Sequence, residues 1–172
     1  MASFASRLVD AVRSKGNPVC VGLDPRLGSL PEECLESSQD LETQARAYAK
    51  FCCQIIDVVA PMVPIVKPQA AFFEQLGPHG MVALGQVLNH ARAQGVMTIL
   101  DGKRNDIGST AIAYAEGWLG ESSAWGADSL TVSPYLGSDS LEPFSETAIQ
   151  RDCGIFVLVK TSNPGGGYLQ DV

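Results

Sequence analysis

Five short apolar runs recur along the chain, and segments with helical periodicity separate them. The runs are 19–24, 63–67, 97–103, 129–133 and 155–162. Each is almost continuously apolar rather than alternating, which is typical of strands covered on both faces. Between the runs, apolar residues recur at spacings of three and four, as the stripe of Met81, Leu84 and Leu88 illustrates. The alternation predicts parallel βαβ units.

Two folds are built from such units, an open doubly wound sheet and a (β/α)8 TIM barrel. A dinucleotide-binding doubly wound sheet has G-x-G-x-x-G after its first strand, whereas this chain has GLDPRLG there. The charged residues that end the strands are Asp24, Lys67, Asp101, Lys103 and Lys160. The C-terminal ends of the strands form the rim on which barrel active sites are built. We therefore expect an α/β protein with the barrel fold, as a single domain over residues 1–172.

The length of the chain sets a limit on this barrel. A complete barrel takes about 250 residues, whereas the chain has 172 residues and five βα units. We expect the N-terminal portion of a longer protein, without roughly three strands, and negligible turnover by these residues alone. At the start, Phe4, Leu8 and Val12 share one face before Gly16, which predicts a short amphipathic lid helix.

Composition excludes several classes of function. A net charge of −7 argues against nucleic acid or an anionic membrane as a partner, although a local pocket can still bind a small anion. No apolar run is long enough to span a bilayer. The five cysteines are odd in number and contain no C-x-x-C, which argues against a disulfide framework or a zinc site. Reduced cysteines of this kind indicate a cytoplasmic protein.

The stretch DGKRND places acids and bases directly after an apolar strand. Asp101 and Lys103 are two residues apart, so their side chains point to the same side of the strand. Lys67 ends the preceding strand, which is a neighbour in a parallel barrel. Together with Asp106, from this chain or from a partner, they predict a ring of alternating charges at the barrel mouth. The alternative is a structural ion-pair network, although buried ion pairs barely break even against apolar residues.

The surrounding residues resemble a known family. The stretch ILDGKRNDIGSTA (99–111) is similar to the signature of orotidine 5′-phosphate decarboxylases, apolar-apolar-Asp-x-Lys-x-x-Asp-Ile-x-x-Thr. The stretches VGLDPR (21–26), VKPQAAFFEQLGPHGM (66–81), TVSPYLG (131–137) and VKTSNPG (159–165) resemble the bacterial branch of this family with longer chains. The resemblance covers nearly the whole chain in the same order.

The resemblance implies a reaction and a catalytic group. The family removes CO₂ from C6 of orotidine 5′-monophosphate to give UMP in de novo pyrimidine biosynthesis, with no metal or organic cofactor. It implies that Lys103 stabilises the negative charge that builds on C6 and donates the proton. Asp101 would hold Lys103 and lie beside the departing carboxylate. Lys67 and Asp106 would complete the charge network, and Lys67 would also bind a ribose hydroxyl.

The resemblance also implies how the nucleoside monophosphate is bound. Asp24 would bind the ribose, and Ser162 would contact the pyrimidine ring. Asp106, Ile107 and Thr110 would reach into the neighbouring subunit, which makes the active unit a homodimer with shared active sites. The phosphate would be bound by loops after the seventh and eighth strands, which this chain does not contain.

Several alternatives stay open at this stage. Related sugar-phosphate lyases, such as hexulose-phosphate synthase, share the D-x-K-x-x-D core and use Mg²⁺, although VKPQAAFFEQLG and SNPG fit the pyrimidine enzyme better. The chain could also be an inactive dimerisation or scaffold piece. Among single residues, Thr110 could be a helix N-cap and Ser162 an ordinary turn former. Arg104 is interpreted as a solvated loop charge, and Lys160 as a residue outside the site.

Overall fold

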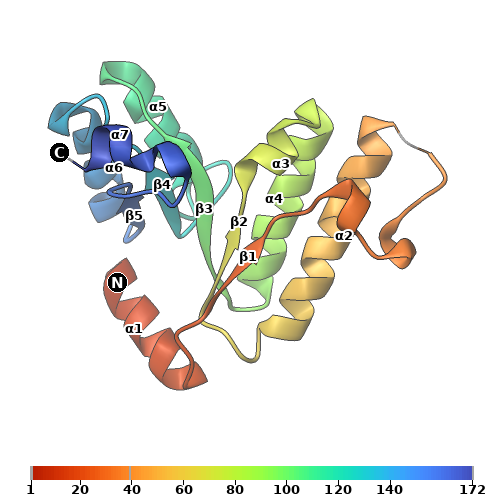
Figure 1. Cartoon of the computed structure of the whole chain (residues 1–172). Coiled ribbons are helices and arrows are strands. Elements are labelled where there is room, and N and C mark those ends of the chain that lie inside the picture. Colours follow the sequence, from red (N-terminus) through yellow and green to blue (C-terminus); the bar gives the residue numbers. More distant parts are fainter. Residues whose placement is uncertain (1, 39, 172) are drawn as a thin grey trace.

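The computed structural model describes residues 2–38 and 40–171 and contains one sheet of five parallel strands. The strands are β1 (Cys20–Leu23), β2 (Ile65–Pro68), β3 (Met97–Arg104), β4 (Ser129–Val132) and β5 (Gly154–Val157). Their spatial order is β1-β2-β3-β4-β5, the same as their order in the chain (Figure 1). A doubly wound sheet reverses its strand order at a switch point. The uninterrupted order seen here is that of a barrel wall.

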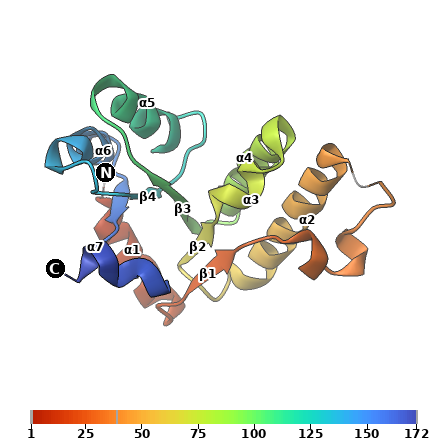
Figure 2. The ribbon, with the colours of Figure 1, turned by 45° about the horizontal axis from the view of Figure 1, so that its top comes forward.

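Helices precede, connect and follow the strands. They are α1 (Phe4–Lys15), α2 (Leu41–Val59), α3 (Ala70–Glu74), α4 (Gly77–Ala93), α5 (Gly108–Trp118), α6 (Ser138–Gln150) and α7 (Gly167–Gln170). Short 3-10 turns occur at Leu27–Ser29, Glu32–Cys34 and Pro164–Gly166. Figure 2 shows α2, α4, α5 and α6 on one side of the strands and α1 on the other. In the part of the chain described, no helix is long and apolar enough to cross a membrane.

The three central strands, β2, β3 and β4, bury side chains on both faces, which explains why their sequences are nearly continuous apolar runs. Residues that point outward pack against the helices, and this set includes Val66, Leu100, Leu130 and Val132, all fully buried. Residues that point inward form a second cluster of Phe4, Ile65, Met97 and Ile99. Because side chains alternate along a strand, Lys67 and Asp101 share the inward face with Ile65 and Ile99.

Helix α1 closes the inner face at the N-terminal ends of the strands. It ends where the sequence predicts, at Gly16, whose φ of 62° suits a glycine at a helix C-terminus. The Phe4 ring packs edge-to-face on Phe156, with centroids 6.0 Å apart. Arg7 donates to Asp128 Oδ1 at 2.9 Å and to the carbonyl of Asp152 at 3.0 Å. The helix is therefore a floor under the barrel and not the expected lid, because its apolar face is buried against the beginnings of the strands.

Candidate active site

Asp101 is the centre of a charged cluster on the inner face, near the C-terminal ends of β2 and β3. Its side chain is only 9% exposed. Lys103 Nζ lies 2.7 Å from Oδ1, and Lys67 Nζ lies 2.9 Å from Oδ2. The structure thus brings together three of the four residues expected in the ring of charges, because β2 and β3 are neighbours and their inward side chains share one face.

Two neutral side chains complete the hydrogen bonding of Asp101. Gln69 Nε2 donates to Oδ2 at 2.9 Å, and Thr131 Oγ1 donates to Oδ1 at 2.9 Å. Each carboxylate oxygen therefore accepts from one ammonium group and one neutral donor. Sequence reasoning missed both neutral residues. The two-residue alternation could have found Gln69, which follows Lys67 by two, and Thr131 on the strand beside Asp101.

These donors decide the charge of Asp101. Burial by itself raises the pKa of this carboxyl, but hydrogen bonds from Lys103, Lys67 and Thr131 outweigh burial and lower the pKa to about 2. Asp101 is therefore a carboxylate at neutral pH. A fixed anion between two ammonium groups holds both cations in place, so the cluster can present positive charge to a ligand in the barrel mouth.

Lys103 sits on an irregular backbone. Its φ is 47°, in the left-handed region that a residue with a side chain rarely adopts. The register between β3 and β4 shifts at this point, because Leu100 pairs with Leu130 and Arg104 pairs with Val132. β3 thus advances by four residues where β4 advances by two, and the extra residues of β3 form a bulge. The Lys103 N–H donates to Thr131 Oγ1 at 2.9 Å.

Asp106, Ile107 and Thr110 lie apart from this cluster, and none of them is among the four donors to Asp101. Asp106 Oδ1 accepts the N–H of Ile107 at 2.8 Å, and the Ile107 side chain is 59% exposed. Helix α5 begins at Gly108 with Ile107 as its N-cap residue. Thr110 is exposed within the first turn of α5, so the interpretation of Thr110 as the N-cap is wrong. The helix starts earlier than Thr110 because the chain turns directly after Asp106.

Asp24 directly follows β1, and Ser162 lies five residues beyond the end of β5. A Cβ built on Gly22 would lie 3.5 Å from Asp24 Oδ1, and Gly22 pairs with Lys67 in the β1–β2 register. The Asp24 carboxylate therefore lies on the face that holds Lys67. Ser162 is exposed beyond β5, and it is not a partner of Asp101. Lys160, interpreted as outside the site, forms an ion pair with Asp171.

The environment of Arg104 differs from the one inferred from the sequence. Its side chain is only 18% exposed and forms an ion pair with Glu74. The guanidinium carbon lies 5.6 Å from the ring centre of Tyr114 and 5.5 Å from that of Trp118. Arg104 is therefore not a solvated loop charge. It is the last residue of β3, and it points outward from the bulge, where aromatic rings and a carboxylate compensate its charge.

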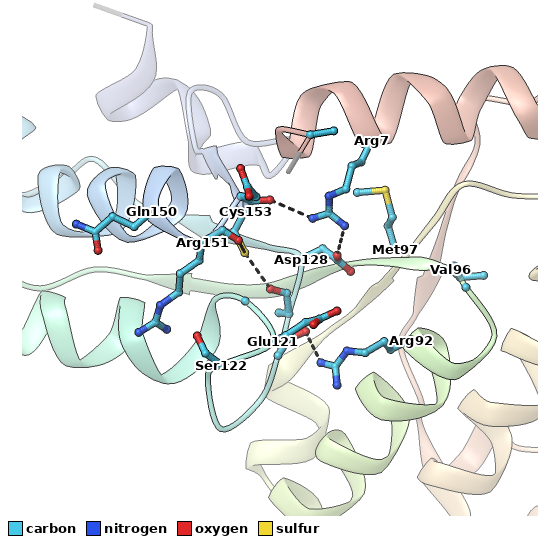
Figure 3. Close-up of a pocket in the computed structure, with 16 residues that line it drawn as sticks. Arg7, Arg92, Val96, Met97, Glu121, Ser122, Asp128, Gln150, Arg151 and Cys153 are labelled. Carbon is cyan, nitrogen blue, oxygen red and sulfur yellow. Dashed lines mark hydrogen bonds and ion pairs between the residues drawn. The ribbon is translucent and has the colours of Figure 1, made fainter.

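A separate cavity of about 630 Å³ lies at the opposite end of the strands (Figure 3). Three arginines line it, and each of them bonds to main-chain carbonyls. Arg7 donates to the carbonyl of Asp152, Arg92 to that of Gly126, and Arg151 to two carbonyls at the end of α5. These guanidinium groups hold loops together beneath the strands. The Asp101 cluster, at the C-terminal ends, is therefore the better candidate for the active site.

Comparison with known proteins shows the family of this chain. Residues 17–172 match the model of the family described as "Orotidine 5'-phosphate decarboxylase / HUMPS family". The chain belongs to this family. An orotidine 5′-phosphate decarboxylase from Rhodopirellula baltica is 60% identical over 178 residues, which cover 100% of this chain and 59% of that protein.

Solved structures of the orotidine 5′-phosphate decarboxylase / HUMPS family have the same fold. A crystal structure from Streptomyces avermitilis, assigned as an orotidine 5′-phosphate decarboxylase, has a TM-score of 0.88 and 40% identity, and the match covers 99% of this chain and 57% of that one. The OMP decarboxylase of Leishmania donovani has a TM-score of 0.78 and 37% identity, over 99% of this chain and 58% of that one. The chain thus spans about three fifths of the length of these relatives. The chain forms five βα units of a (β/α)8 barrel, as predicted.

Proposed function

We propose that the native protein removes CO₂ from orotidine 5′-monophosphate to give UMP, with Lys103 as the proton donor to C6. One observation carries this proposal: an almost fully buried carboxylate, Asp101, fixes the ammonium groups of Lys103 and Lys67 at the barrel rim. The relatives at 60% and 40% identity that are named for this activity support it.

The reaction requires a fixed positive charge at one carbon. When the bond between C6 and its carboxyl group breaks, the electron pair stays on C6, and the carboxyl group leaves as CO₂. The Lys103 ammonium stabilises the growing negative charge and transfers one proton to C6. The neutral amine then regains a proton from water. Asp101 holds the Lys103 ammonium in position through a contact of 2.7 Å.

Repulsion between Asp101 and the substrate carboxylate supplies only a part of the rate. Two like charges about 4 Å apart interact by roughly 4 kcal/mol at an effective dielectric near 20. Enzymes lower barriers by about 8–23 kcal/mol. The larger share comes from preorganised charge at Lys103 and from the binding energy of the ribose and phosphate.

The hydrogen bonding of Asp101 also bears on the magnesium-dependent alternative. A carboxylate that ligates Mg²⁺ directs a free lone pair at the ion. Both oxygens of Asp101 already accept two hydrogen bonds each, from Lys103 and Thr131 and from Lys67 and Gln69. This donor set suits an anion that holds ammonium groups, and it favours the decarboxylase over a sugar-phosphate lyase.

We also propose that the active unit is a homodimer in which Asp106, Ile107 and Thr110 enter the partner's site. Apolar side chains exposed around these residues support a protein partner on this surface. They are Ile107, Ile112, Tyr135 and Leu136, with exposed fractions of 59%, 45%, 75% and 45%. All four belong to α5 or to the loops that follow β3 and β4, on the rim that carries the cluster.

Three further assignments belong to the same proposal. Asp24 binds the ribose, since its carboxylate lies on the face of Lys67. Ser162 contacts the pyrimidine, which its position beyond the end of β5 allows. We propose a cytoplasmic location, because the five thiols are unpaired and two of them, Cys34 and Cys52, are buried in the core.

The test uses the native protein, because about two fifths of the length of the relatives has no counterpart here. Purified protein should consume orotidine 5′-monophosphate and release UMP and CO₂ in equal amounts, at the same rate with and without EDTA. A protein that leaves the nucleotide untouched contradicts the proposal. Turnover of a sugar phosphate that stops on addition of EDTA establishes the lyase alternative.

A further inference from the structure

Thr131 makes two hydrogen bonds with one hydroxyl group. Its oxygen accepts the N–H of Lys103 at 2.9 Å, and its hydrogen is donated to Asp101 Oδ1 at 2.9 Å. The same Asp101 oxygen accepts from Lys103 Nζ at 2.7 Å. The backbone, the side chain and the counter-ion of Lys103 are thereby linked through a single group on β4.

The Lys103 backbone needs such a link. Its φ of 47° costs free energy, and residues in sparsely populated conformations persist only where their surroundings hold them. Regular pairing between β3 and β4 stops at Leu100 and resumes at Arg104, so the β3–β4 ladder does not restrain the three residues between them, and Lys103 is one of these. The Thr131 hydroxyl replaces the missing ladder bond.

Thr131 itself is fixed from its other side. It pairs with Phe156 in the parallel register of β4 and β5. The adjacent residues Leu130 and Val132 are fully buried against the helices. The hydroxyl is therefore presented to the bulge by a strand whose position does not depend on the bulge.

We propose that Thr131 is a positioning residue for Lys103. Its hydroxyl holds the left-handed backbone at the bulge and aims Asp101 Oδ1 at the ammonium, so that the proton is presented at one point in the barrel mouth. This role rests on the proposed decarboxylase function. A displacement of about 1 Å in a catalytic group can cost roughly 100-fold in rate.

Two variants separate the hydroxyl from the shape of the side chain. Thr131→Val keeps the shape and loses the hydroxyl, and we expect kcat to fall by about 10- to 100-fold with KM changed by less than about threefold. Thr131→Ser keeps the hydroxyl and loses a methyl group, so kcat should stay within about threefold of the parent. If Thr131→Val does not fold, Thr131→Ala takes its place.

The matched control is Ser129→Ala, which removes another hydroxyl from the same strand. Ser129 is fully buried, and its Oγ donates to the carbonyl of Thr98, away from Asp101. This variant should keep the parent kcat. Unchanged turnover in Thr131→Val overturns the proposal, and so does a Thr131→Ser variant as slow as Thr131→Val.

A second measurement does not depend on activity. Hydrogen exchange at the Lys103 amide, followed by NMR, should be slow in the parent, in Thr131→Ser and in Ser129→Ala, and at least about tenfold faster in Thr131→Val. Equal exchange in Thr131→Val and the parent overturns the proposal, even in a protein that proves not to be a decarboxylase. Absence of turnover in the parent is a failure of the proposed function alone.

Discussion

Lys67 Nζ lies 2.9 Å from Asp101 Oδ2, although 34 positions of sequence separate the two residues. The contact depends on the lateral pairing of β2 and β3, which is extended by a bridge between Gln69 and Asp101. Asp101 is thus held from a neighbouring strand as well as from Lys103 on its own strand. A substitution of Lys67, Asp101 or Lys103 should therefore change the electrostatic environment of the other two side chains.

Replacement of Lys103 should abolish turnover and leave the fold intact. Lys103→Ala removes the proton donor and the charge nearest the reacting carbon, so we expect kcat to fall by at least about 10²- to 10⁴-fold. Steady-state kinetics measures the loss, and circular dichroism checks the fold. The control is Lys50→Ala on α2. Lys50 is exposed and donates to the carbonyl of Glu33, so it takes no part in the Asp101 cluster. A Lys103→Ala variant as active as Lys50→Ala would exclude this residue as the donor.

Acid should weaken the protein partly through Asp101. The pKa of Asp101 is about 2 in the folded protein and 3.8 ordinarily, a difference that corresponds to about 2 kcal/mol. Because the folded pKa is the lower one, this stabilisation is present above about pH 4 and is lost as pH falls toward 2. Urea unfolding of the parent and of Asp101→Asn measures it at each pH. The gap in unfolding free energy between the two proteins should shrink between pH 5 and pH 2, and a gap that is constant with pH contradicts the prediction.

Two helical glycines should respond oppositely to alanine. A Cβ at Gly80 of α4 would lie 1.9 Å from the Phe73 carbonyl oxygen, so Gly80→Ala must push α3 and α4 apart. We expect a loss of roughly 1–3 kcal/mol in the free energy of unfolding. Nothing lies within 4 Å of a Cβ at Gly117 of α5, and Gly117→Ala should stabilise the protein by about 0.5–1 kcal/mol. Thermal or urea unfolding distinguishes them, and equal effects would show that the packing of α3 on α4 is not tight.

The floor helix should matter for stability and not for turnover. Arg7→Ala removes the bonds to Asp128 and to the carbonyl of Asp152, and the Arg7 side chain is 37% exposed, so we expect a loss of about 0.5–1.5 kcal/mol. Arg13→Ala is the matched control, since the Arg13 side chain is 78% exposed and pairs with Asp10 at 3.9 Å. Urea unfolding and kcat should be measured for both. A large fall in kcat for Arg7→Ala would contradict the placement of the active site at the opposite end of the strands.

Alternation of side chains and strand order together determine much of the site. The positions of Asp101 and Lys103 at the end of one strand, with Lys67 at the end of its neighbour, were enough to predict that these three meet. Apolar runs predicted all five strands, and in β2, β3 and β4 the physical reason is burial on both faces of the sheet. The last strand is shorter than predicted, because β5 is only four residues long and ends at Val157.

Local backbone irregularity accounts for what the sequence could not reveal. The bulge in β3 depends on where two strands lose and regain their register, and no short pattern in DGKRND specifies it. The outward direction of Arg104 and the start of α5 at Gly108, which leaves Thr110 inside the first turn, were likewise not evident from the sequence. The proposed role of Thr131 was missed for the same reason. Thr131 accepts a hydrogen bond from Lys103, and this contact depends on the position of Lys103 in the bulge.

The floor of the barrel joins α1 to β5, which lie far apart in the sequence. Phe4 packs against Phe156, and a Cβ at Gly154 would lie 2.3 Å from the Phe4 ring. During synthesis, α1 leaves the ribosome before β5 and waits about 150 residues for this partner, which takes roughly ten seconds or more at about 5–20 residues per second. Its apolar stripe stays uncovered during that interval. The helix that seals the finished protein is thus, during synthesis, a segment that a chaperone could bind.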